Sequence, residues 1–141
     1  MRTTYTRTID TLPRIMRELG AYCREHRVGG PTEFVMTFAV EEVFTNMVKY
    51  NPSGPPEIGM AVDVKDRRLV ISLEDDQLHE FDPVAAPAPD LRKKIAERRP
   101  GGLGIYLVKA MVESVEYQRV GTVNTITLSH SVDAGNVQRD V

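Results

Sequence analysis

The stretch Gly101-Gly102-Leu103-Gly104-Ile105-Tyr106-Leu107-Val108 places three glycines directly before an apolar helical pattern. Glycine lets a backbone approach a ligand closely, and the first turn of a helix offers unpaired N–H groups at the positive end of its dipole. An anion, most simply a phosphate, is therefore expected here. Glycine-rich turns also serve many ordinary loops, so this interpretation depends on the rest of the chain.

Length and composition restrict the class of protein. A chain of 141 residues with 41% hydrophobic residues can bury one core, so a single domain over residues 1–141 is expected. The net charge of −2 offers no broad basic surface, and no direct nucleic-acid partner is predicted. The single cysteine, Cys23, indicates a structural thiol. No apolar run approaches the roughly 20 residues of a membrane span, and the sequence does not begin with a signal-peptide pattern, so a cytoplasmic protein without a membrane partner is expected.

The hydrophobic periodicity predicts three helices and five strands. Strands are expected over residues 3–9, 58–64, 69–73, 115–120 and 124–129, and helices from a cap at Thr11 to Gly29-Gly30, over 32–50 and over 103–114. The proline-rich segment 77–100 is expected to be a long functional loop, and a polar tail begins near residue 133. These elements indicate an α+β, two-layer sandwich whose mixed, mainly antiparallel sheet is covered on one face by three helices.

The second predicted helix carries polar residues inside an apolar pattern. Glu42 lies close to the face of Val35 and Phe38 on a helical wheel, and Asn46 follows on the same face one turn later. Burial of either group without a partner is costly, so each should meet a ligand, an ion or a hydrogen-bonding group. The spacing alone also fits ordinary core polar residues that are capped or paired.

Three acids follow the apolar strand that ends near Leu73, namely Glu74, Asp75 and Asp76. An aspartate at a strand end can accept a hydrogen bond from an amine of a base or ring. Solvation of loop acids explains the same pattern when it is considered alone.

The combination of these motifs resembles the Bergerat-fold (GHKL) ATPase domain, and it is most similar to the bacterial anti-sigma-factor serine/threonine protein kinases. The resemblance runs from Thr8 to Ser129. It is carried by the motifs Glu42-Val43-Phe44-Thr45-Asn46, Phe81-Asp82-Pro83, Arg99-Pro100 with the glycine-rich stretch, and Val115-Glu116-Tyr117 through Asn124-Thr125-Ile126-Thr127-Leu128.

The resemblance implies a role for each matching position. Asn46 would give its oxygen to a Mg²⁺ ion on the phosphates of ATP, and Glu42 would be the general base for a serine hydroxyl. Asp76 would accept the adenine amine with help from Thr127, and residues 77–100 would form the ATP lid. The phosphates would be held by Gly101, Gly102, Leu103, Gly104 and Ile105. The implied partners are an anti-sigma antagonist protein, a sigma factor and a second copy in a homodimer.

The sequence departs from the family at two positions and leaves an alternative function. Leu78 stands where the family usually has glycine beside the adenine site, and Tyr50 stands where relatives often have histidine. Leu78 favours a non-catalytic, degenerate Bergerat domain that sequesters a regulatory protein, whereas the pair Glu42 and Asn46 opposes this alternative. A Rossmann dinucleotide site needs a strand directly before the glycines, and this sequence has none there. A sensor histidine kinase needs a phosphoacceptor helix, which does not fit within this length.

Overall fold

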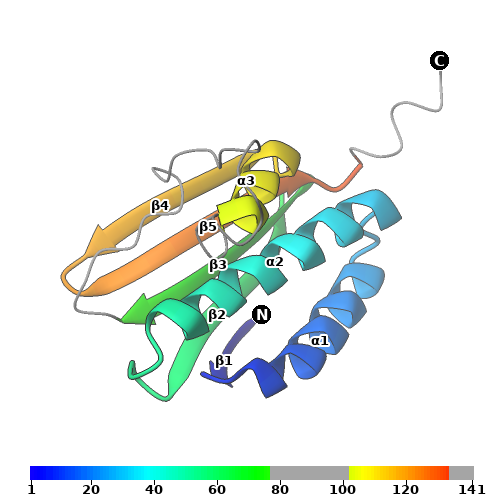
Figure 1. The fold of residues 1–141 in the computed structure, drawn as a ribbon. Coiled ribbons are helices and arrows are strands. Elements are labelled where there is room, and N and C mark those ends of the chain that lie inside the picture. The colour runs from blue at the N-terminus through cyan, green and yellow to red at the C-terminus, as the bar shows by residue number, and fades with distance from the viewer. Residues whose placement is uncertain (77–101, 134–141) are drawn as a thin grey trace.

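The computed structural model describes residues 1–76 and 102–133, so Gly101, the predicted lid and Leu78, and residues 134–141 of the predicted tail lie outside the described residues. Figure 1 shows one layer of helices on one layer of strands. The elements are β1 (Arg2–Thr6), a 3₁₀-helix η1 (Ile9–Thr11), α1 (Leu12–Glu25), α2 (Gly30–Tyr50), β2 (Glu57–Lys65), β3 (Arg68–Asp76), α3 (Gly102–Met111), β4 (Ser114–Val120) and β5 (Val123–Ser131).

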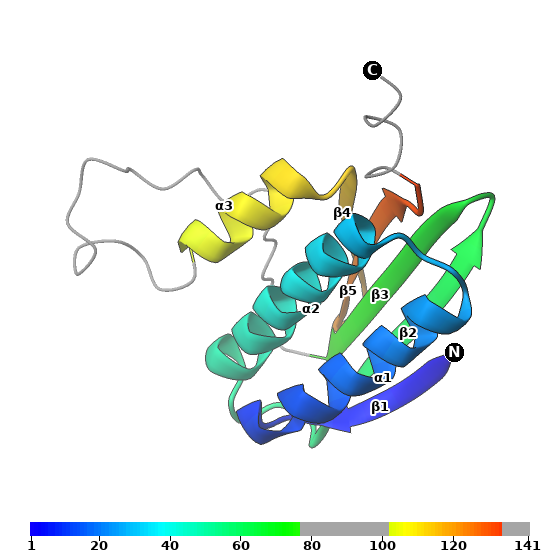
Figure 2. The same cartoon turned by 90° about the vertical axis from the view of Figure 1, so that its right-hand side faces the viewer.

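The sheet has the strand order β1-β2-β3-β5-β4, and all four pairings between described strands are antiparallel. The helices cover one face in the order α1, α2, α3, with α2 over the middle of the sheet (Figure 2). This arrangement confirms the predicted two-layer α+β fold with three helices. The prediction of a mixed sheet also allowed a parallel pair of strands, but none of these four pairings is parallel.

The strands alternate between the helix side and the uncovered side, as antiparallel strands with one covered face do. On β3, Leu69, Ile71 and Leu73 are buried on the helix side. On β5, Ile126 and Leu128 are buried on that side. The alternation continues without interruption into polar residues at the end of β3 and the start of β5, and it thereby places polar groups in the layer between sheet and helices.

Helix α1 packs on the sheet through one stripe of side chains. Ile15, Leu19 and Cys23, spaced four residues apart, are fully buried. Burial raises the pKa of the Cys23 thiol to about 11, which keeps it protonated and supports its prediction as a structural thiol. The neighbouring strand β1 is joined to this helix by Tyr5, whose hydroxyl donates to the Glu18 carboxylate at 2.7 Å.

Both ends of α1 differ from the predicted capping. Thr11 occupies the N-cap position, but its hydroxyl donates to the Thr6 carbonyl at 2.9 Å and does not cap the helix. At the other end, Arg27 has φ = 56°. Its N–H bonds the Arg24 carbonyl while the Val28 N–H bonds the Cys23 carbonyl, the hydrogen-bond pattern of a Schellman motif. The helix therefore ends at Glu25, and Arg27 takes the left-handed position after it, before the glycines that were predicted to end the helix.

Helix α2 is the central helix, and most of one side is buried. The apolar pattern of this helix does not bury all of its apolar residues. Phe34, in the first turn, is 66% exposed, while Phe44 in the second half is fully buried. Burial therefore depends on the face of the helix on which a residue lies, and both halves contribute buried apolar residues to the core.

Arg27→Gly should stabilise the fold by about 1 kcal/mol, because glycine adopts a positive φ without the steric cost that a side chain meets. Urea unfolding monitored by circular dichroism measures the change. The matched control is Arg17→Gly, which removes an exposed arginine inside α1 and should destabilise by about 1 kcal/mol through lost helix propensity. Equal losses in both variants would contradict the prediction.

Candidate functional site

The predicted base and the predicted glycine meet where α2 contacts α3. A Cβ atom added at Gly104 would lie 2.5 Å from Cδ and 3.3 Å from Cγ of Glu42. The carboxylate of Glu42 therefore rests against the first turn of α3, where unpaired backbone N–H groups are found. Glycine is needed at residue 104 because any side chain would displace this carboxylate.

Glu42 has the electrostatics of a proton acceptor. It is partly buried, and burial raises the pKa of its carboxyl group above the usual value, helped by the neighbouring charge of Glu41. The exposed Lys49, two turns further along α2, opposes this shift and lowers the pKa. A carboxyl pKa closer to neutrality makes a carboxylate a better general base.

Asn46 lies one turn after Glu42 and is 2% exposed. Its Nδ2 atom is buried and has no hydrogen-bond partner in the structure of the described chain. Because the amide can turn by half a rotation with little change in shape, it can present either its oxygen or its NH₂ group to a ligand. Mg²⁺ usually takes one or two protein oxygens together with water and phosphate, so a single amide here fits such a site.

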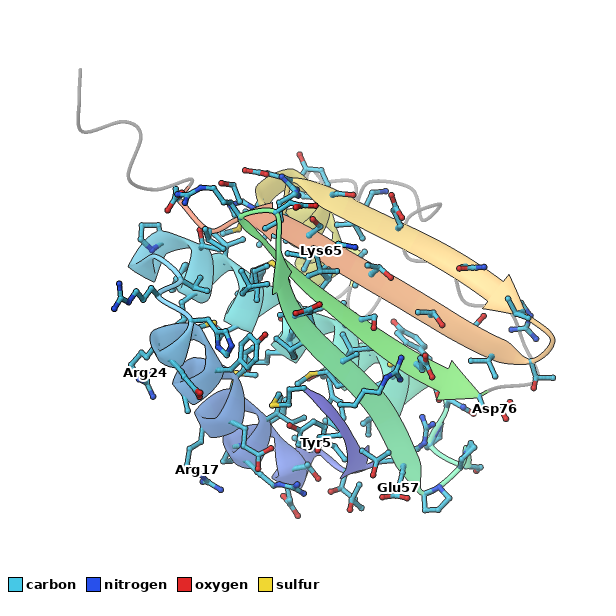
Figure 3. All side chains as sticks on the ribbon, turned by 180° about the vertical axis from the view of Figure 1, so that it is seen from behind. Tyr5, Arg17, Arg24, Glu57, Lys65 and Asp76 are labelled. Atoms are coloured by element: carbon cyan, nitrogen blue, oxygen red, sulfur yellow. The ribbon has the colours of Figure 1, made fainter. Side chains whose placement is uncertain are left out.

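The buried acid at the end of β3 is Asp75, which corrects the prediction of Asp76. Asp75 follows Leu73 by two residues, so it lies on the helix side and is 1% exposed. Asp76 is exposed on the opposite face, at the tip of β3 in Figure 3. Only Asp75 shares the layer that contains Asn46. One of its oxygens, Oδ2, is buried without a hydrogen-bond partner in the described structure.

Arg7, which the sequence analysis did not select, holds Asp75 in place. Its buried guanidinium donates to Asp75 Oδ1, to the Pro55 carbonyl at 2.7 Å, and to the Met47 and Asn51 carbonyls at 3.2 Å each. The last two carbonyls end α2, where a cation is favoured by the helix dipole. Arg7 lies two residues after the buried Tyr5, so strand alternation places both on the same face. This spacing is the sequence signal that could have identified Arg7 as a buried residue.

Thr127 does not lie on the helix side, which corrects its predicted adenine contact. It pairs with Ser72 and Glu116, and alternation turns it toward the uncovered face. The β5 residue beside Asp75 is Asn124, which is 1% exposed and paired with Asp75 in the strand register. Its Nδ2 atom is likewise buried without a partner in the described structure.

The glycine-rich segment is partly described. Gly102 begins α3, as the predicted phosphate site requires, whereas Gly101 and the side chain of Leu103 lie outside the description. Ile105 is 7% exposed and belongs to the hydrophobic core. Any contribution of Ile105 to a phosphate site therefore comes from its backbone.

A hollow of about 460 Å³ lies on the uncovered face of the sheet, away from the residues above. Its floor consists of small residues, Gly59, Ala61 and Ser72, with Arg2 and Glu74 also lining it. No described group of three or more His, Cys, Asp or Glu residues could hold a metal there or elsewhere in residues 1–76 and 102–133.

The fold and these side chains define an ATPase domain of the histidine kinase type. The sequence matches the histidine kinase-like ATPase domain family over residues 5–130, and the chain belongs to this family. An ATPase domain implies ATP binding. The buried unpaired atoms of Asn46 and Asp75 and the close approach at Gly104 fit such a ligand. No described helix is long and apolar enough to cross a membrane.

Two known proteins are similar to this chain, one in sequence and one in fold. It is 29% identical over 101 residues to the serine/threonine-protein kinase BtrW of Bordetella bronchiseptica strain RB50, covering 70% of each chain. Its fold matches a solved structure of RsbU and RsbW domains from Mycobacterium tuberculosis with a TM-score of 0.66 and 16% identity. That match covers 93% of this chain and 31% of the other, so the chain spans about a third of that longer protein. The chain is therefore similar in sequence to a serine/threonine-protein kinase, and it shares its fold with the matched structure.

Gly104→Ala should stabilise the protein by less than the roughly 1 kcal/mol that glycine-to-alanine gives inside a helix, because moving the Glu42 carboxylate aside carries a penalty. Chemical unfolding of Gly104→Ala, Glu42→Ala and the double variant forms a thermodynamic cycle. The double variant should lose most of the penalty. Gly30→Ala is the control, since a Cβ there meets nothing within 4 Å. Additive effects of the two substitutions would contradict the contact.

Glu42→Gln should raise thermal stability at neutral pH and leave it unchanged near pH 3. The raised folded pKa means that the native state holds a proton more tightly than the unfolded state. Wild-type stability therefore falls as pH rises from about 4.3 to the folded value, and glutamine removes this loss. Melting temperatures of both proteins across this range measure the difference. Glu25→Gln, at an exposed end of α1, is the control, and a difference that does not change with pH would contradict the assignment.

Proposed function

We propose that this protein is an ATP-dependent serine/threonine protein kinase of the anti-sigma-factor type, with Mg²⁺ and ATP at the α2–α3 site. The observation that carries the proposal is the contact between Glu42 and the backbone at Gly104, with Asn46 one turn away. A partly buried carboxylate, a buried amide with an unpaired atom and a helix N-terminus then face one region. Phosphoryl transfer depends mainly on such positioning and on charge neutralisation.

Each of these residues would have one task. ATP supplies the γ-phosphoryl group, and Mg²⁺ neutralises the phosphate charge. Asn46 would hold the metal through its amide oxygen, and the N-terminal turn of α3 would bind phosphate oxygens through backbone N–H groups. Glu42 would accept the proton of a serine hydroxyl while the serine oxygen forms a bond to the γ-phosphorus and ADP departs. Asp75 would accept the exocyclic amine of adenine, in place of Asp76.

The partners follow from the relatives and are part of the proposal. The serine belongs to an anti-sigma antagonist protein, and the kinase also binds a sigma factor. The resemblance to the anti-sigma kinases, together with the named kinase relative and the RsbW-type fold, supports this assignment. A homodimer completes the proposal, with β1 and α1 as the elements that face the second copy.

Asn46→Ala should weaken binding of Mg-ATP about tenfold or more, because it removes the protein's oxygen from the metal. Glu42→Gln should keep Mg-ATP binding and lower phosphoryl transfer to the antagonist by roughly 10²–10⁴-fold, since the base is lost. Isothermal titration measures the first effect, and transfer of radiolabelled phosphate measures the second.

The exposed Glu25→Gln variant should behave like the wild type in both assays. Wild-type protein that binds Mg-ATP and the antagonist without any phosphate transfer would contradict the kinase and favour the sequestering module. Absence of Mg-ATP binding by the wild type would contradict the nucleotide site itself.

A further inference from the structure

We propose that Asn124 reads the base: its amide donates a hydrogen bond to the ring nitrogen beside the exocyclic amine of adenine, while Asp75 accepts from that amine. Arg119 and Tyr117 act as positioning residues that fix the amide. The inference rests on the proposed ATP site and adds to it the residues that select the base.

The orientation of the Asn124 amide is set by its neighbours on β4. Its Oδ1 accepts hydrogen bonds from the Tyr117 hydroxyl at 2.5 Å and from the Arg119 guanidinium at 2.9 Å. A guanidinium carries only donors, so the atom that faces it must be the amide oxygen. The NH₂ group of Asn124 is therefore the end left for another partner.

A donor and an acceptor remain unused side by side. Asn124 and Asp75 are register partners on β5 and β3, and both point to the helix side. Asn124 Nδ2 and Asp75 Oδ2 are buried, yet neither has a hydrogen-bond partner within the described structure, so they do not bond each other. Arg7 holds the other oxygen of Asp75, which fixes the carboxylate as the Arg119 contact fixes the amide.

The ligand edge that satisfies both atoms has a donor next to an acceptor. Adenine carries this pair as its exocyclic amine and an adjacent ring nitrogen, N1 on one side or N7 on the other. Guanine has such a pair, O6 and N1–H, in the reverse order, so it would have to turn over to use both groups. Because an unpaired buried polar group costs roughly 1–3 kcal/mol, a ligand that satisfies both atoms gains affinity from them.

The test is isothermal titration of the protein with ATP, 1-deaza-ATP and 7-deaza-ATP in the presence of Mg²⁺. Each of the two analogues lacks one ring nitrogen. Wild-type protein should bind one analogue about tenfold more weakly than ATP, as expected for one lost hydrogen bond. Asn124→Ala should bind ATP about as weakly as the wild type binds that analogue, and it should no longer distinguish the two ligands. Arg119→Met, which releases the amide, should reduce the same discrimination and serves if Asn124→Ala does not fold.

Thr125→Ala, which removes a hydroxyl from the uncovered face beside Asn124, is the matched control and should retain full discrimination. Equal affinity of the wild type for all three nucleotides would overturn the inference. So would an analogue penalty that Asn124→Ala and Arg119→Met both keep. Absence of Mg-ATP binding by the wild type would overturn the inference together with the proposed function, and that outcome is distinct from binding without discrimination.

Discussion

The buried guanidinium of Arg7 is the interaction on which the arrangement of the site depends. It joins the chain after β1 to the last carbonyls of α2, to the connection that follows α2 and to Asp75 on β3. Removal of one partner from a buried ion pair leaves an uncompensated charge and typically costs about 3–5 kcal/mol. The same contact therefore stabilises the fold and sets the position of Asp75, the acid that we propose binds adenine. It also explains how residues that are far apart in the sequence, from Arg7 to Asp75, order a single site.

The fold class could be predicted because its determinants are local patterns. Apolar spacing in α1 and alternation in β2, β3 and β5 give the number, kind and order of the elements without tertiary information. The ends of α1 could not be predicted in the same way. Two glycines after the helix are a strong signal for its end, yet Arg27 takes the positive φ because the Val28 side chain, 8% exposed, joins the core at that point. Tertiary packing overrode local preference there.

Which polar residues share one face is easier to predict from the sequence of a helix than from that of a strand. Glu42 and Asn46 are four residues apart on one helix, so they share a face whatever the exact ends of that helix. On a strand, a shift of one residue moves a side chain to the other face. Asp75 and Asp76 are chemically identical, and only the parity of Leu69, Ile71 and Leu73 separates them. The same parity separates Asn124 from Thr127. The pairing of Asn124 with Asp75 depends on the strand register, which cannot be read from the sequence.

The three unpaired buried atoms, on Asn46, Asp75 and Asn124, make the helix side of the sheet costly to maintain without a ligand. At roughly 1–3 kcal/mol each, their combined cost is a large part of the 5–15 kcal/mol that holds an ordinary domain together. At Asn46, an apolar side chain would remove such an atom and give a more stable protein with the same fold. The atoms also belong to three different elements, α2, β3 and β5, so no single helix or strand requires them for its own formation. A ligand that pairs with all three would explain such a set: the base edge proposed above has partners for Asp75 and Asn124, and a phosphate oxygen can accept from the Asn46 amide.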